Sequence, residues 1–170
     1  MEIRSEIENG AKFGHIFRVV VRDRNGRLKF VKDFHNTYTD EGLTDMLEKY
    51  YRGSDYTAAH YVGLLNGTPA ETDTMASHGG WTEVTAYSED SRPQIVWSPA
   101  SNKSINNTAN KVRFSINANN TTFNGVFICT DPTKGGTTGI LVAAGNFASS
   151  RTLANGDTID VEIVCNSSSA

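Results

Sequence analysis

The feature that most constrains the fold is a segment from residue 59 to residue 165 in which short apolar or alternating runs are separated by polar turns. Within residues 111–117 the alternation is strict, so Val112, Phe114 and Ile116 share one face of a strand. Strands spaced about ten to fifteen residues apart, without helical periods between them, favour an antiparallel β-sandwich or jelly roll. The expected strands cover residues 60–65, 81–87, 94–98, 111–117, 122–130, 139–145 and 158–165.

A β-hairpin is predicted over residues 13–34. Its two apolar-rich runs flank the sequence Asp23-Arg-Asn-Gly26, and the pair Asn25-Gly26 is expected to supply the two positive φ angles of a type I′ turn. A phosphate-binding ribbon is one interpretation of its basic residues. The preferred one is a solvated ribbon face, because acidic residues elsewhere in the first sixty positions balance the charge. These basic residues are Arg18, Arg22, Arg24, Arg27, Lys29 and Lys32.

One short amphipathic helix is predicted over residues 39–53. Leu43, Met46, Leu47 and Tyr50 follow the i, i+3, i+4, i+7 spacing of a single apolar helix face. Thr39 or Asp40 is expected to cap the start of the helix, and Gly53 to take the left-handed position that ends it. The chain is therefore expected to be mainly β, with an N-terminal hairpin and one helix.

Length and charge bound the remaining possibilities. A chain of 170 residues is the size of one domain. We expect an N-terminal arm over residues 1–12, a sandwich over residues 59–165 and a flexible tail over residues 166–170. A net charge of −3 disfavours direct binding to nucleic acid or to an anionic membrane. The charged N-terminus and the lack of a long apolar window predict a chain made in the cytoplasm.

Residue patterns that would indicate catalysis or metal binding are weak. The four histidines never form a metal-ligand spacing, although a cation site built from Asp73, His78 and Glu83 is conceivable. The run His78-Gly-Gly80 is similar to an oxyanion segment, but the chain has no Gly-x-Ser-x-Gly nucleophile elbow. We therefore expect no catalytic residue, no metal and no cofactor.

Two cysteines and a set of aromatic residues leave alternatives open. Cys129 and Cys165 each follow strand-like runs, and we expect two reduced thiols unless their strands are neighbours. Tyrosine and tryptophan residues gather in the middle third of the chain, where core packing is the preferred interpretation and a subunit interface the alternative. They are Tyr50, Tyr51, Tyr56, Tyr61, Trp81, Tyr87 and Trp97.

Several segments carry a resemblance to a known family. The run Asp73-Thr-Met-Ala-Ser-His-Gly-Gly-Trp-Thr-Glu83 is the most specific of them. Others lie at residues 61–67, 87–93, 133–141, 145–147 and 155–163. Over residues 39–164 the chain resembles small virion-associated structural proteins encoded by tailed bacteriophages.

The resemblance implies a non-enzymatic component of the virion. Our first hypothesis is a capsid decoration or cement protein that assembles as a homotrimer and binds the major capsid protein. The candidate interface residues are Asp73, His78, Trp81, Arg22 and Arg24. The alternative is a tail or head-fibre component that binds a host-surface glycan through Trp or Tyr faces and Asn side chains at loop tips.

Overall fold

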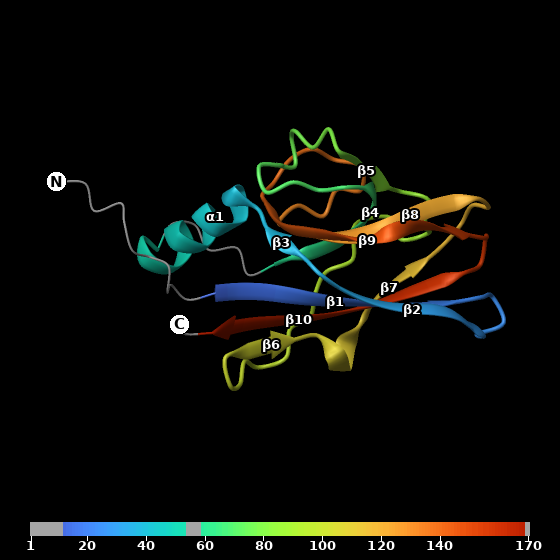
Figure 1. The fold of residues 1–170 in the computed structure, drawn as a ribbon, viewed down its shortest axis with the longest axis horizontal. Coiled ribbons are helices and arrows are strands. Elements are labelled where there is room, and N and C mark those ends of the chain that lie inside the picture. The colour runs from blue at the N-terminus through green and yellow to red at the C-terminus, as the bar shows by residue number, and fades with distance from the viewer. Residues whose placement is uncertain (1–11, 54–58, 169–170) are drawn as a thin grey trace.

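The computed structural model describes residues 12–53 and 59–168 and contains two antiparallel β-sheets packed face to face (Figure 1). The strand order is β2-β1-β10-β6 in one sheet, where β7 also pairs with β10, and β3-β9-β8-β4-β5 in the other. The predicted antiparallel sandwich is confirmed. Its strands are β1 (Lys12–Arg22), β2 (Leu28–His35), β3 (Thr37–Tyr38), β4 (Tyr61–Gly67), β5 (Trp81–Val84), β6 (Ser104–Asn106), β7 (Val112–Ser115), β8 (Thr121–Cys129), β9 (Leu141–Leu153) and β10 (Thr158–Ser168).

The first sheet is organised around the long pairing of β1 with β10. Their register runs from Lys12 opposite Ser168 to Arg22 opposite Thr158, a length of about 35 Å at the rise of an antiparallel strand. The other edge of β10 pairs with β6 near its end and with β7 near its start. Buried Asn107 fills the gap, because its side-chain oxygen accepts from the Ile163 amide at 2.7 Å. β10 thus extends through part of the segment that the sequence assigned to a tail.

The β1–β2 hairpin is confirmed, but its turn type was predicted wrongly. Among the described residues of this turn, only Gly26 has a positive φ, of 78°. The Gly26 amide donates to the Asp23 carbonyl at 2.9 Å, and the Asp23 carboxylate accepts from the Asn25 and Arg27 amides. This pattern is a turn closed by a glycine bulge, and the register shift between Val21 and Arg22 accompanies it.

The main core lies between the two sheets. A second core lies on the outer face of the second sheet, which has the order β3-β9-β8-β4-β5. β8 is buried at eight of its nine positions. Its residues Phe123, Val126 and Ile128 belong to the main core, whereas Phe127 packs in the second core with Trp81 and Met75. The β4–β5 connection, residues 68–80, contributes Met75 to this cluster. Both faces of the sheet are therefore buried, which explains why β8 is apolar almost throughout.

Several strand boundaries differ from the sequence predictions. β9 extends to Leu153, eight residues beyond the predicted end, and β6 lies outside the expected strands, in a polar stretch that the sequence leaves open between a loop and an edge strand. Residues 94–98 were predicted to form a strand, yet Gln94 makes only an isolated bridge with Tyr61. The Val62 amide donates to the Pro93 carbonyl, and the Ile95 amide donates to the His60 carbonyl. This segment is therefore held at the start of β4 without forming a ladder.

The helix α1 (Asp40–Tyr51) begins and ends as predicted, but its apolar face was interpreted wrongly. The Thr39 hydroxyl accepts from the Gly42 amide at 3.0 Å, and Gly53 has a positive φ of 66° beyond the last turn. Gly42 lies against the backbone of Val142 and is the buried residue of the helix. Leu47 and Tyr50 on the predicted apolar face remain 60% and 84% exposed. The helix thus contacts the sheet through its glycine and leaves apolar side chains at the surface.

A fully buried arginine, Arg92, ties two long loops to the outer face of the second sheet. Its guanidinium donates to both oxygens of Glu83, at 2.9 and 2.7 Å, and to the carbonyls of Asp131 and Gly136, at 3.0 and 2.7 Å. It also lies 5.3 Å from the centre of the Phe127 ring. A buried charge requires such complete pairing, so Arg92 fixes the loops that flank β5 and follow β8.

Candidate functional site

The five candidate interface residues predicted from the sequence lie in two separate groups. Trp81 donates its indole N–H to the Asp73 carboxylate at 2.9 Å, and the His78 ring stacks on the indole with centroids 4.0 Å apart. Arg22 and Arg24 lie at the β1–β2 hairpin turn instead. The structure brings the first three together and leaves the two arginines elsewhere; the contacts that either group makes with partners stay predictions.

The conspicuous run from Asp73 to Glu83 has an internal packing role. Trp81 is 3% exposed and packs 5.1 Å from the Phe127 ring. Asp73 also accepts from the Ala70 amide, so its carboxylate holds the loop to the indole. Glu83 binds Arg92 rather than joining Asp73 and His78. The conceivable cation site is therefore not formed, and the described residues contain no group of three or more His, Cys, Asp or Glu suited to a metal ion.

A polar pocket of about 480 Å³ lies at the end of the sandwich where the β1–β2 turn meets the β9–β10 turn and the loop before β8. In Figure 1 these turns gather at the right-hand end, opposite α1 and the end of β10. The pocket is thus built by segments that are far apart in the chain. Its polar lining residues include Asp23, Arg24, Asn25, Lys29, Asn119, Asn155 and Asp157.

Hydrogen bonds and one ion pair fix the walls of this hairpin-end pocket relative to one another. The Lys29 ammonium contacts the buried Asp157 carboxylate at 2.6 Å, which joins β2 to the β9–β10 turn. The same carboxylate accepts from the Ala154 amide at 2.9 Å. The Asn119 side-chain oxygen accepts from the Asn155 amide at 2.9 Å. Three connections are therefore pinned together before any ligand binds.

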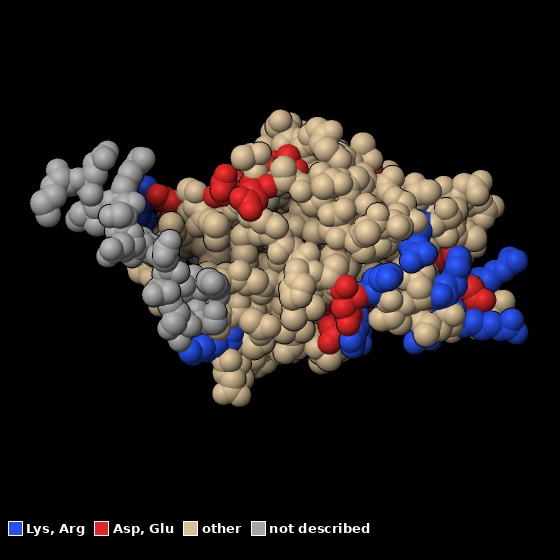
Figure 2. Space-filling model, in the orientation of Figure 1, with Lys and Arg blue, Asp and Glu red and all other residues tan. Residues whose placement is uncertain are grey.

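Basic side chains surround the same end of the molecule. Figure 2 shows Lys and Arg side chains gathered over the hairpin end with a few Asp and Glu side chains among them, and further Asp and Glu side chains over the middle and the opposite part of this face. The residues concerned at the hairpin end are Arg22, Arg24, Arg27, Lys29 and Arg151, against the carboxylates of Asp23 and Asp157. Five positive and two negative charges leave a local surplus of three on a chain whose net charge is −3.

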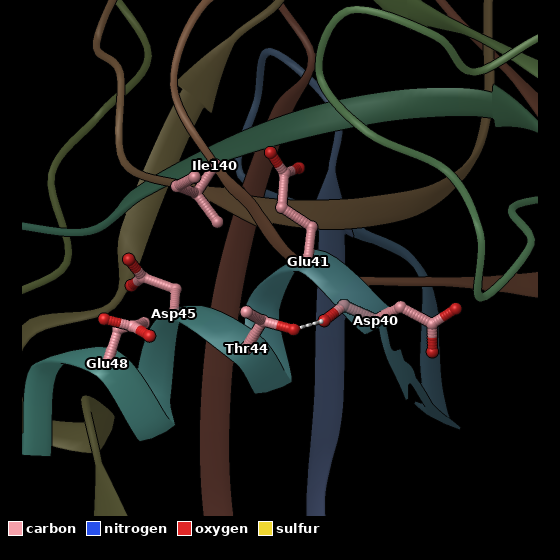
Figure 3. A pocket seen from close by; sticks show the side chains of 6 residues that line it. All are labelled: Asp40, Glu41, Thr44, Asp45, Glu48 and Ile140. Carbon is pink, nitrogen blue, oxygen red and sulfur yellow. Dashed lines mark hydrogen bonds between the residues drawn. The ribbon is translucent and has the colours of Figure 1, made fainter. Parts of the chain in front are cut away.

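An acidic groove of about 390 Å³ lies along α1, lined by Asp40, Glu41, Thr44, Asp45, Glu48 and Ile140 (Figure 3). Three of the four carboxylates already have partners, because Glu41 accepts from the Leu141 amide, Asp45 pairs with Lys49 and Glu48 pairs with Arg52. The Thr44 hydroxyl donates to the Asp40 carbonyl at 2.8 Å. The polar groups of the groove are therefore used in contacts within α1 and with the start of β9.

A buried polar network joins β1, β3 and β10 on the side of the sandwich near α1. Asn36 donates to His15 Nδ1 at 2.7 Å, and the Tyr38 hydroxyl lies 3.3 Å from His15 Nε2 and 3.2 Å from Cys165 Sγ. Burial lowers the pKa of His15 to about 4 and raises the pKa of the Cys165 thiol. The network therefore holds a neutral imidazole and a protonated thiol, which is the opposite of an activated cysteine.

The two cysteines are free and lie on strands, as the sequence predicted. Cys129 is on β8 and Cys165 is on β10, which belong to different sheets. Burial raises the pKa of Cys129 to about 11. Both thiols are therefore poor nucleophiles at neutral pH.

The middle-third aromatic residues are divided between core and surface. Tyr87 is fully buried, and Trp81 is nearly so, which confirms the core interpretation for these two rings. Tyr50 and Tyr51 are 84% and 78% exposed on α1, at the end opposite the hairpin. Tyr56 lies outside the described residues. Trp81 and Tyr87 therefore offer no exposed ring face to a sugar.

Comparison with known families agrees with the virion resemblance and makes it more specific. The family described as podophage GP4 fiber I protein gp80 matches residues 37–165, about three quarters of the chain. No curated protein and no solved structure matches significantly. The helix α1 has 12 residues and carries acidic side chains in every turn, so it lacks the length and apolarity of a membrane span. No helix in the described part of the chain is a candidate membrane span. The chain belongs to the podophage GP4 fiber I protein gp80 family, a family of virion fibre proteins of tailed phages.

Proposed function

We propose that this protein is a fibre component of a tailed-phage virion that contacts glycans on the host surface. The observation that carries the proposal is membership of a fibre family over residues 37–165. Fibres are the projecting parts of a particle, so a host-surface ligand fits this membership better than a shell lattice does. The capsid-decoration hypothesis, with the major capsid protein as partner, has no corresponding support.

The distribution of surface features is consistent with a fibre subunit that has one end for assembly and one for recognition. Exposed Leu47, Tyr50 and Tyr51 lie on α1, near the end of β10, whereas the polar pocket lies at the hairpin end. Large exposed apolar side chains on one element are typical of a protein–protein contact. A homo-oligomer can bury such a patch by repeating it around one axis. We therefore assign α1 to contacts between copies of this chain in a homotrimer.

Two measurements test the proposed function. Labelling the protein in purified virions for electron microscopy should locate it on fibres, at tens rather than hundreds of copies per particle. The purified full chain, added in excess, should compete with virions for adsorption to host cells. Particles that lack the protein should adsorb poorly while keeping their resistance to heat and osmotic shock. Unchanged adsorption together with genome leakage at lower temperature would restore the capsid-decoration hypothesis.

A further inference from the structure

We propose that the hairpin-end pocket binds an acidic saccharide, with Arg24 pairing with a carboxylate or phosphate of the sugar and asparagine side chains binding its hydroxyl groups. This inference rests on the proposed function, because it names the ligand class and the site of the host contact. It is carried by the pocket's fixed walls, its unused polar groups and the surplus of positive charge on the residues around it, since the lining itself holds two basic and two acidic side chains.

Side chains that face the pocket retain unused hydrogen-bonding capacity. Across residues 12–53 and 59–168, the Arg24 guanidinium and the side-chain amides of Asn25 and Asn155 have no hydrogen-bond or ion-pair partner. Asn119 uses its oxygen on the Asn155 amide, which leaves its NH₂ group as a donor. Amides that offer both donors and acceptors match the hydroxyl groups of a sugar, each of which also donates and accepts.

The position of Arg24 is restricted by the neighbouring turn. Gly156 has a positive φ of 89°, and a Cβ at that position would lie 3.0 Å from Arg24 Cβ. The Arg24 Cβ therefore lies directly against the β9–β10 turn. The Asp23 carboxylate on the other side is occupied by the Asn25 and Arg27 amides. The base of the Arg24 side chain is thus fixed at the pocket, and its guanidinium has its charge available for bidentate pairing with an anion.

The positive charge around the pocket favours an acidic saccharide over a neutral one. In the lining, Lys29 and Asp157 neutralise each other, and the Asp23 carboxylate accompanies Arg24. Arg22, Arg27 and Arg151 lie outside the lining and add three positive charges at the same end of the sandwich. A neutral saccharide would leave this surplus uncompensated, and an acidic one would reduce it. A nucleic acid would also be anionic, but bases need aromatic stacking platforms, and none of the lining residues is aromatic. The acidic saccharide is therefore the ligand class that fits both the amides and the charge.

The experiment uses the full chain on a multivalent array of neutral, uronate-containing, sialylated and phosphorylated saccharides, with a single-stranded oligodeoxynucleotide as an additional probe. Multivalent display compensates for a weak single-site affinity. We expect binding to one or more acidic saccharides. In the Arg24→Gln variant this binding should fall about tenfold or more, the loss typical of a charge-assisted hydrogen bond. Asn155→Ala, made in the wild type, should also weaken binding to acidic saccharides without unfolding the protein.

The matched control is Arg52→Gln, which removes the same charge from an exposed arginine on the far side of the molecule, just beyond α1. It should bind the array like the wild type. No binding to acidic saccharides, preference for neutral saccharides or for the oligonucleotide, or an equal loss in both variants would each overturn the pocket assignment. If the wild type and Arg24→Gln compete equally in the adsorption assay, the pocket inference fails while the fibre function stands. If the wild type binds acidic saccharides on the array but does not compete with virions for adsorption, the pocket inference stands and the proposed host contact fails.

Discussion

Protonation of His15 should destabilise the fold in mildly acidic solution. The imidazole is buried and bonded to Asn36 as a neutral ring, and burial lowers its pKa from 6.5 to about 4. Because the unfolded chain binds the proton more tightly, the stabilisation is fully present above pH 6.5 and is lost as the pH falls toward 4. A shift of 2.5 units corresponds to a limit of about 3.4 kcal/mol, of which about 2 kcal/mol is already lost at pH 5.

The assay compares urea unfolding of the wild type and of His15→Gln at pH 7 and pH 5, followed by tryptophan fluorescence. His15→Gln cannot titrate, so its free energy of unfolding should fall between these pH values by about 2 kcal/mol less than that of the wild type. The pKa of His60 is also lowered by burial, and its charge helps to lower the pKa of His15, so the difference between the two proteins measures His15 together with its interaction with His60. Asp33, whose pKa is lowered by its hydrogen bond from Arg18, loses its contribution only below its ordinary pKa of 3.8, outside this window. Identical pH dependence of the two proteins, or an NMR titration of His15 near 6.5, would refute the reasoning.

Three further outcomes are expected. Arg92→Met should lower the free energy of unfolding by about 3–5 kcal/mol, because it leaves the Glu83 carboxylate buried and unpaired, and adding Glu83→Leu should recover most of the loss in urea titrations. Trp81→Ala should cost about 3–5 kcal/mol by emptying the second core, and an unchanged melting temperature would show that the β4–β5 connection packs without it. Leu47→Glu should shift the full chain toward monomer, as measured by light scattering after size exclusion. Leu28 on β2 has a similar exposure, so Leu28→Glu is the control and should leave the oligomeric state unchanged. Equal behaviour of the two variants would contradict the assignment of α1 to contacts between copies.

Local signals in the sequence predicted most of the fold, and long-range contacts account for the differences. The capping residue Thr39, the terminal Gly53 and the alternation around Phe114 each act within a few residues, so the sequence pattern contains them. β6 was not among the expected strands, because its three residues are too few to show a pattern and form a strand by pairing with the edge of β10. The exposed face of α1 escaped prediction for a related reason, since helical periodicity indicates an apolar face and not what covers it.

The candidate site was predicted only in part. Asp73, His78 and Trp81 stand out in the sequence because they are chemically distinctive, yet their interactions with one another hold a loop over the second core. The hairpin-end pocket combines residues more than 130 positions apart, from Arg24 to Asp157, and asparagines in turns are individually unremarkable. The available signals were two Asn-Gly pairs, at residues 25–26 and 155–156, and the basic residues of the hairpin, which indicate a pocket only after the strand order is known.

The boundary of the family match passes through this pocket. The match begins at residue 37 and therefore excludes the β1–β2 hairpin, although β1 is a central strand whose Phe17, Val19 and Val21 are fully buried. The strands of the hairpin are thus required by the core, although they lie outside the match. Because the β9–β10 turn and Asn119 lie inside the match, a ligand bound here contacts one wall within the family segment and one outside it. Replacing residues 23–27 by a neutral turn that keeps Gly26 should therefore abolish binding to acidic saccharides while leaving the melting temperature nearly unchanged. If the altered protein keeps its saccharide preference, ligand selection resides in the family segment alone.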